Sequence, residues 1–294
     1  MGSSSPLAGR TVVVTGAARG VGAALAREAA RRGARVALLG HEKAALEAVA
    51  ASLPGPALAV EADVTDLAAL DAAARAVRSG LGRPSAVVAN AGIAEGGAFL
   101  ASDPAAWRRV IDVNLTGSSH TARAFLPDLF DTAGYFLQIA SLASIGAAPL
   151  MSAYCASKAG VEAFGHALRA EVAHRGVAVG IAYLNWTDTD MIRDADRYTL
   201  LRALRTRMPP PADRVHSVDA VAARLVRGME RRRTAVYAPP WLRLAQPLRP
   251  AIPPVVLRVA RRELPRLESE DPARCTGPLG AGGRADQEAS GQDG

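Results

Sequence analysis

The chain has few cysteines, few aromatic side chains and almost no lysine. Its two cysteines, Cys155 and Cys275, allow no disulfide framework and show no metal-ligand spacing, so the sequence predicts no metal site. No basic cluster is interleaved with aromatic residues, which argues against a nucleic-acid partner despite the net charge of +7. Lys43 and Lys158 are the only lysines among 35 basic residues. Their rarity draws attention to Lys158.

Segments that direct a chain to a membrane are also missing. The N-terminal stretch lacks the basic start and apolar core of a signal peptide. No apolar run approaches the roughly 18 residues that a membrane-spanning helix needs. These absences predict a cytoplasmic protein.

Short apolar or β-branched runs alternate with longer helical patterns from residue 10 to about residue 238. Parallel strands need helical crossovers between them, so this alternation predicts an α/β fold with a doubly wound parallel sheet. The expected strands are Thr11–Val14, Arg35–Leu39, Ala57–Val60, Ala86–Ala89, Tyr135–Ile139, Val177–Tyr183 and Ala235–Tyr237. The expected helices include Gly20–Arg32, Lys43–Leu53, Leu67–Arg78 and Leu115–Phe130.

The remaining segments divide the chain further. Residues 1–8 are expected to be a flexible N-terminus before a catalytic domain at 9–240, and 241–264 an amphipathic extension that contains four prolines. The extension is interpreted as a helix packed on its own domain or on a partner subunit. Peripheral membrane contact is the less favoured interpretation. Residues 265–294, rich in Gly and acidic side chains, are expected to be disordered.

A glycine-rich turn joins the first strand to the first helix. It reads Thr15-Gly16-Ala17-Ala18-Arg19-Gly20-Val21-Gly22. Glycines in this position let the backbone approach a pyrophosphate, which then meets the free N–H groups at the helix N-terminus. The candidate cofactor residues here are Gly16, Arg19, Gly20, Val21 and Gly22.

The end of the second strand bears on the choice of cofactor. An acidic residue there binds the ribose hydroxyls of NAD, but this chain has Leu39-Gly40-His41. Arg19 in the glycine-rich turn is a candidate partner for a 2′-phosphate. The sequence therefore favours NADP(H) over NAD(H).

A tyrosine and the rare lysine lie four residues apart, at Tyr154 and Lys158. That spacing places both side chains on one face of a helix, one turn apart. An ammonium group beside a phenol favours the phenolate, so we expect Lys158 to lower the pKa of Tyr154. Such a pair can give or take a proton at a carbonyl or alcohol oxygen.

Together these residues resemble the short-chain dehydrogenase/reductase family. The motif TGAARGVG, Asn90-Ala91-Gly92 after a strand, Asn114, Ser141, Tyr154 and Lys158 match it in order and spacing over about residues 8–238. The resemblance implies a seven-stranded Rossmann domain that binds NAD(P), forms a homodimer or homotetramer and acts on a small-molecule carbonyl or alcohol. It also implies that Asp63, followed by Val64, contacts the adenine ring.

The same resemblance implies the catalytic roles. Asn114, Ser141, Tyr154 and Lys158 are the catalytic set. Tyr154 is the general acid or base, and Lys158 lowers its pKa and binds the nicotinamide ribose. Ser141 binds the substrate oxygen, while Asn114 holds a water that links Lys158 to solvent.

One stretch departs from the family pattern. After the sixth strand the family has Pro-Gly, and this chain has Leu184-Asn185. Asn tolerates a left-handed backbone, so Asn185 is expected to preserve the turn. Thr189 matches the residue that meets the nicotinamide carboxamide.

The substrate is less well defined. The family's helical lid corresponds to about 191–215, which mixes apolar side chains with arginines and favours an apolar substrate. Two alternatives stay open: a redox-neutral epimerase or dehydratase that uses the same residues, and a catalytically weak regulatory protein that binds NAD(P).

Overall fold

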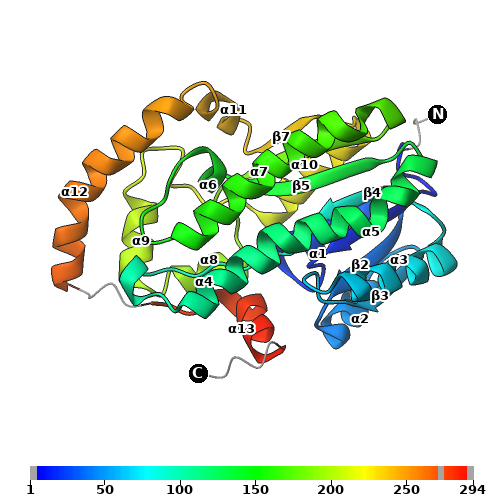
Figure 1. Ribbon diagram of the computed structural model, residues 1–294, viewed down its shortest axis with the longest axis horizontal. Helices are drawn as coiled ribbons and strands as arrows, with labels where there is room; N and C mark the ends of the chain where they lie inside the picture. The colour runs from blue at the N-terminus through cyan, green and yellow to red at the C-terminus, as the bar shows by residue number, and fades with distance from the viewer. Residues whose placement is uncertain (1–4, 271–274, 290–294) are drawn as a thin grey trace.

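The computed structural model describes residues 5–270 and 275–289, and a single parallel sheet forms its centre (Figure 1). The sheet has seven strands in the order β3-β2-β1-β4-β5-β6-β7, and every pairing is parallel. This confirms the predicted doubly wound α/β fold. The strands are β1 (Thr11–Thr15), β2 (Arg35–Gly40), β3 (Ala57–Glu61), β4 (Pro84–Ala89), β5 (Tyr135–Ser141), β6 (Ala178–Leu184) and β7 (Ala235–Ala238).

Helices cover both faces of the sheet because its inner strands are apolar on both sides. In β1, Val12 and Val14 face one helical layer and Val13 faces the other, and all three are fully buried. The first layer holds α1 (Gly20–Arg31), α2 (Lys43–Ala51) and α10 (Val218–Glu230). The second holds α3 (Leu67–Leu81), α4 (Pro104–Ile111), α5 (Gly117–Asp131) and α7 (Ser152–Val172).

Shorter elements surround the carboxyl ends of the strands. The predicted lid region contains α8 (Asp190–Ala195) and α9 (Thr199–Thr206), and α6 (Leu142–Ile145) follows β5. A π-helical turn, η2 (Asp112–Thr116), joins α4 to α5, and two short 3₁₀ turns are η1 (Phe99–Ala101) and η4 (Arg249–Ala251). A third, η3 (Ala173–Arg175), precedes β6 at the opposite end of the strands.

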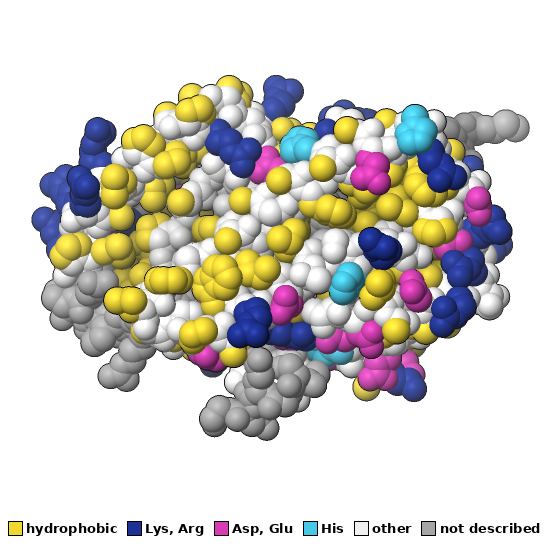
Figure 2. Space-filling model, in the orientation of Figure 1, with side chains coloured by type: hydrophobic (Ala, Val, Ile, Leu, Met, Phe, Trp, Pro, Cys, Tyr) yellow, Lys and Arg dark blue, Asp and Glu magenta, His cyan; other side chains and the backbone are white. Residues whose placement is uncertain are grey.

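The extension after β7 contains α11 (Leu242–Ala245) and α12 (Ile252–Glu270), so its helix continues past the predicted end at residue 264. Leu242 is buried against the domain, which agrees with the packed interpretation for α11. By contrast α12 runs along one side of the molecule with most of its side chains exposed, and Figure 2 shows arginine and apolar side chains together on its exposed surface. Within the described ranges, none of the helices is both long and apolar enough to cross a membrane.

Both terminal expectations need correction. Residues 5–8 are anchored rather than flexible, because Leu7 is buried in the core and the Ser5 hydroxyl donates to Glu230 at 2.6 Å. In the region expected to be disordered, residues 275–289 fold back onto the domain and form α13 (Gly280–Ala289) (Figure 1). Residues 1–4, 271–274 and 290–294, which the same expectations cover, lie outside the described ranges.

Candidate active site

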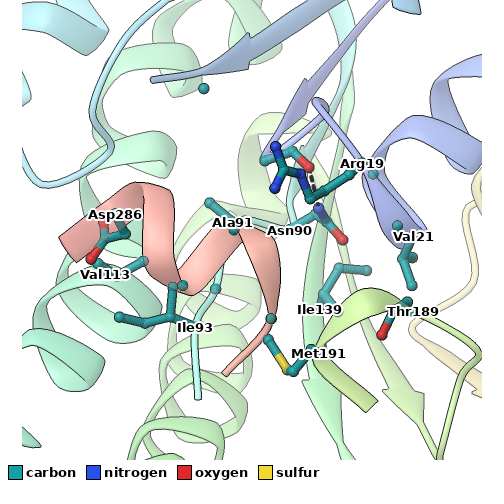
Figure 3. A pocket seen from close by; sticks show the side chains of 18 of the residues that line it. Arg19, Val21, Asn90, Ala91, Ile93, Val113, Ile139, Thr189, Met191 and Asp286 are labelled. Atoms are coloured by element: carbon teal, nitrogen blue, oxygen red, sulfur yellow. Dashed lines mark hydrogen bonds between the residues drawn. The ribbon is translucent and has the colours of Figure 1, made fainter. Parts of the chain in front are cut away.

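A pocket opens at the carboxyl ends of β1, β4, β5 and β6 (Figure 3). It lies where β1 separates the two halves of the sheet, with β2 on one side and β4 on the other. In open α/β sheets this change of direction leaves a crevice beyond the strand ends. Every predicted cofactor residue lines the pocket, as do Ser141, Tyr154 and Lys158, whereas Asn114 lies behind its wall.

The glycine-rich turn borders the pocket. At two of its glycines, neighbouring backbone atoms lie so close that a side chain would not fit. Gly16 has φ +62°, and a Cβ atom there would lie 2.8 Å from Ala91 Cα. A Cβ atom at Gly22 would lie 2.2 Å from the Gly16 carbonyl oxygen. Asn90 stabilises the turn, since its Nδ2 donates to the Thr15 carbonyl at 2.9 Å and to the Gly16 carbonyl at 3.2 Å.

The end of α1 offers donors to an anion in this pocket. Its N-cap residue, Arg19, has an extended backbone and makes no side-chain cap hydrogen bond, so the first N–H groups of the helix are left for a ligand. His41 also lines the pocket and has a buried Nε2 with no hydrogen-bond partner. These groups fit a dinucleotide, because its phosphates accept hydrogen bonds and its ribose hydroxyls both donate and accept them.

Arg19 has an acidic partner that sequence reasoning missed. Its guanidinium donates to Glu42 at 2.6 Å, and Glu42 lines the same pocket just beyond β2. The strand end itself, Leu39-Gly40-His41, carries no acid, as the sequence indicates, but Glu42 comes two residues after Gly40 and turns back toward the glycine-rich turn.

Tyr154 and Lys158 occupy one face of α7, as their spacing predicts. The Lys158 ammonium lies 5.6 Å from the centroid of the Tyr154 ring and donates to the Ile139 carbonyl at 3.3 Å. Burial lowers the pKa of Lys158 to about 8, with no acidic group opposing the shift. A buried cation with so few partners favours a ligand that brings hydroxyl acceptors, such as a ribose.

The expected lowering of the Tyr154 pKa by Lys158 does not occur in this structure. Burial raises the pKa of Tyr154 to about 12, and a hydrogen bond from Ser141 opposes that rise. The physical reason is that the phenol is partly buried, and desolvation penalises its charged form. Ser141, at the end of β5 and the start of α6, lines the same pocket as Tyr154, and its hydroxyl accepts from Ala143 N at 3.1 Å.

Asn114 lies in the π-helical turn η2, where an extra residue per turn aims its side chain inward. Its Oδ1 accepts from Ile93 N at 2.8 Å, and its Nδ2 donates to the Ile93 carbonyl at 3.0 Å and to Ser157 Oγ at 2.8 Å. A Cβ atom on Gly92 would lie 3.1 Å from Asn114 Oδ1 and 3.5 Å from Lys158 Nζ. The two groups therefore flank Gly92.

The departure at Leu184-Asn185 is accommodated by continuing the strand. Leu184 is the last residue of β6 and pairs with both Ser141 and Ala238. Asn185 N donates to the Ala238 carbonyl at 3.1 Å, and its Nδ2 donates to the Ala212 carbonyl at 3.1 Å. Asn185 has no positive φ, so the expectation of a left-handed turn there is wrong. Thr189 still reaches the glycine-rich turn, 3.3 Å from a Cβ atom on Gly20.

Asp63 follows β3 at the other end of the pocket. Burial opposes its ionisation, but the Thr65 amide and Arg109 stabilise the carboxylate and lower the pKa of Asp63. Arg109 is a second missed residue: it donates to Asp63 at 3.0 Å and to Asp286 of α13 at 2.7 Å. No local pattern signals Asp286, because its partner lies 177 residues away.

The glycine-rich turn before α1, the crevice at the strand ends and the Ser-Tyr-Lys cluster define a dinucleotide-binding protein of the Rossmann type. Over residues 10–198 the chain matches the family model described as short chain dehydrogenase. The chain therefore belongs to the short-chain dehydrogenase family and is an oxidoreductase by class.

Similar proteins agree with this membership. An uncharacterised oxidoreductase of Staphylococcus epidermidis is 32% identical over 188 residues, which cover 64% of this chain and 82% of that protein. Meso-2,3-butanediol dehydrogenase of Serratia marcescens is 34% identical over 183 residues, 62% of this chain and 73% of that one. A short-chain dehydrogenase/reductase from Burkholderia phymatum, solved in complex with NAD, superposes with a TM-score of 0.71 at 25% identity, covering 82% of this chain and 93% of that one.

Proposed function

We propose that this protein is an NADP(H)-dependent oxidoreductase that interconverts a ketone or aldehyde and the corresponding alcohol, on an apolar substrate. The observation that carries the proposal is that Ser141, Tyr154 and Lys158 line the same pocket as the glycine-rich turn, with the Lys158 ammonium 5.6 Å from the centroid of the Tyr154 ring. The Serratia relative, a butanediol dehydrogenase by name, supports alcohol and carbonyl chemistry.

Tyr154 is the proton donor of carbonyl reduction in this proposal. With its pKa raised to about 12, the phenol is protonated at neutral pH and can donate to a developing alkoxide. Ser141 shares the substrate oxygen and stabilises its growing charge. When bound, a reduced nicotinamide dinucleotide supplies the hydride that reduces the carbonyl carbon. For alcohol oxidation Tyr154 must first lose its proton, which high pH favours.

Lys158 and Asn114 return the proton to Tyr154. Lys158, with its pKa lowered to about 8, is close to the pH at which it can release and regain a proton. Asn114 Oδ1 keeps one lone pair free after accepting from Ile93 N, and it lies beside Lys158 across Gly92. A water bound between them would connect the lysine to solvent.

The substrate end of the pocket is apolar. Ala94, Leu201 and Leu279 are buried there against Tyr154. Several lid arginines pair with nearby acids and are therefore engaged already: Arg193 with Asp190, Arg205 with Asp196 and Arg207 with Glu263. This arrangement favours an apolar ketone over a substrate that carries an acidic group.

The cofactor preference depends on Arg19 and its competition with Glu42. A 2′-phosphate can take the place of the Glu42 carboxylate at the Arg19 guanidinium. We expect Arg19→Ala to weaken NADPH binding about tenfold and leave NADH nearly unchanged, since one charge-assisted contact is lost. Glu42→Gln should strengthen NADPH binding by several-fold.

Titration of nucleotide fluorescence on each variant measures these affinities. Arg27→Ala is the matched control, because Arg27 is an exposed arginine on the same helix. Tighter binding of NADH than NADPH by the unmodified protein would contradict the proposed preference while leaving the Tyr154 chemistry intact.

The activity itself is tested by incubating the protein with NADPH and a panel of apolar ketones, and identifying products by mass spectrometry. An alcohol two mass units heavier than the ketone is the expected product. A product of unchanged oxidation state would favour an epimerase or dehydratase instead. Cofactor binding without turnover would favour a regulatory protein. We also propose a homodimer or homotetramer, which light scattering measures directly.

A further inference from the structure

The segment 275–289 returns from the far end of the chain to the pocket and is held there by the backbone. Its Thr276 N donates to the Gly96 carbonyl and its Leu279 N to the Ala94 carbonyl, each at 2.8 Å. Glu95 and Pro278 form an antiparallel bridge between these two bonds. We call residues 275–289 the C-terminal strap.

Charged side chains fasten the strap at two further points. Asp194 of α8 accepts from Gly280 N at 2.8 Å and from Arg284 at 2.7 Å; although burial opposes ionisation, these bonds lower the pKa of Asp194. At the other end of α13, Arg109 holds both oxygens of Asp286, at 2.7 and 2.9 Å. Asp286 is almost fully buried, and its pairing with Arg109 is bidentate.

The strap runs along the pocket from its substrate end to its Asp63 end. Figure 3 shows α13 crossing in front of the pocket, with Met191 near its start and Asp286 near its end. Gly280 lies so close to Met191 that a Cβ atom would come within 2.7 Å of its backbone. The strap residues that line the pocket are Leu279, Gly280, Gly282, Gly283 and Asp286.

A small enclosed space remains beneath the strap. The gap between its glycines and the glycine-rich turn belongs to a cavity of about 230 Å³. Arg19 faces Gly282 across the gap. A Cβ atom added at Gly282 would lie 3.8 Å from Arg19 Cδ. Ligand cavities commonly measure about 300–1,000 Å³, so a whole dinucleotide needs the open mouth of the pocket, or a movement of the strap, in addition to this enclosed space.

We propose that the C-terminal strap is the outer wall of the cofactor site, and that it closes over the bound dinucleotide and slows its release. This rests on the proposed function, since it assumes that a nicotinamide dinucleotide occupies the pocket. The Arg109–Asp286 pair neutralises the one strap carboxylate that lines the pocket, so the strap does not repel an anionic cofactor. Cofactor exchange then requires Asp286 to leave Arg109.

The first test is hydrogen exchange on the unmodified full chain. A covering wall becomes less mobile when the dinucleotide lies beneath it, so saturating NADPH should slow exchange of the amides in 280–289 by about tenfold. Faster exchange on binding would mean that the cofactor displaces the strap, and would overturn the proposal. Unchanged exchange in spite of measured binding would overturn it as well.

The second test is stopped-flow release of NADPH from the full chain with Asp286→Asn. Loss of the charged pair should accelerate release about tenfold, which corresponds to about 1.4 kcal/mol. Glu288→Gln is the matched control, because Glu288 is exposed two residues further along α13 and the change in charge is the same. Equal release rates from all three proteins would contradict the closing role.

The two proposals fail in different ways. If the unmodified protein binds neither NADPH nor NADH, the proposed function is wrong, and the strap covers some other pocket ligand or none. If it binds and turns over cofactor while exchange and release are insensitive to the strap, only the closing role is lost.

Discussion

Tyr154→Phe is expected to lower kcat for ketone reduction by about 10²- to 10⁴-fold, the usual contribution of a positioned proton donor. The phenyl ring keeps the packing of Tyr154 in its apolar surroundings, so only the hydroxyl is lost. NADPH affinity should stay within about twofold, because cofactor binding depends mainly on the glycine-rich turn and Lys158. Steady-state kinetics together with fluorescence titration separate the two effects.

Tyr135→Phe is the matched control for this prediction. Tyr135 is also buried, but it lies at the start of β5, where its hydroxyl donates to the Arg233 carbonyl at 2.7 Å. That variant should lose about 1 kcal/mol of stability or somewhat more, and keep kcat. A Tyr154→Phe protein that retains more than a tenth of the activity would show that another group supplies the proton.

Lys158→Met is expected to abolish measurable turnover and to raise the stability of the fold. The ammonium is buried without an acidic partner, and burial lowers its pKa from the ordinary 10.5 to about 8. At neutral pH the folded state therefore carries the cost of a desolvated charge, of the order of 1–3 kcal/mol. Methionine fills a similar volume without that charge.

The pH dependence of this gain has a definite sign. Between about pH 8 and 10.5 the unfolded chain binds the Lys158 proton more than the folded chain does, so stability of the unmodified protein rises with pH over this window. The advantage of Lys158→Met should be largest below pH 8 and shrink toward pH 10.5.

Chemical denaturation at pH 7 and pH 10 measures both values. Lys43→Met is the control, since Lys43 is exposed and is the other lysine of the chain. A Lys158→Met protein that is less stable than the parent at pH 7 would mean that the lost bond to Ile139 outweighs the removed charge.

Much of the fold follows from local pattern. The alternation of apolar strands and amphipathic helices predicts the seven-stranded parallel sheet, with strand ends within about two residues of those observed. The positions of Tyr154 and Lys158 on one helix face follow from helical geometry alone. Likewise, a glycine-rich turn between a strand and a helix can be recognised without a structure, because its backbone constraint is local.

The electrostatics of the site were not predictable in the same way. The sequence indicates that Lys158 is near Tyr154, but it does not show how completely the phenol is enclosed, and burial decides the direction of the Tyr154 pKa. The same holds for Arg19, whose partner Glu42 becomes a neighbour only when the chain turns back after β2.

The C-terminal strap shows this difference most clearly. A segment rich in glycine and acidic residues has no apolar period that would predict a helix, so its sequence alone indicates disorder. Its helix is stabilised by partners distant in the chain: Arg109 for Asp286, Asp194 for Arg284, and the backbone of residues 94–96. The sequence by itself determined the sheet, the family and the reacting side chains, because local periodicity and spacing encode them. Only the tertiary structure decided how the pocket is charged and closed, since both depend on contacts between segments far apart in sequence.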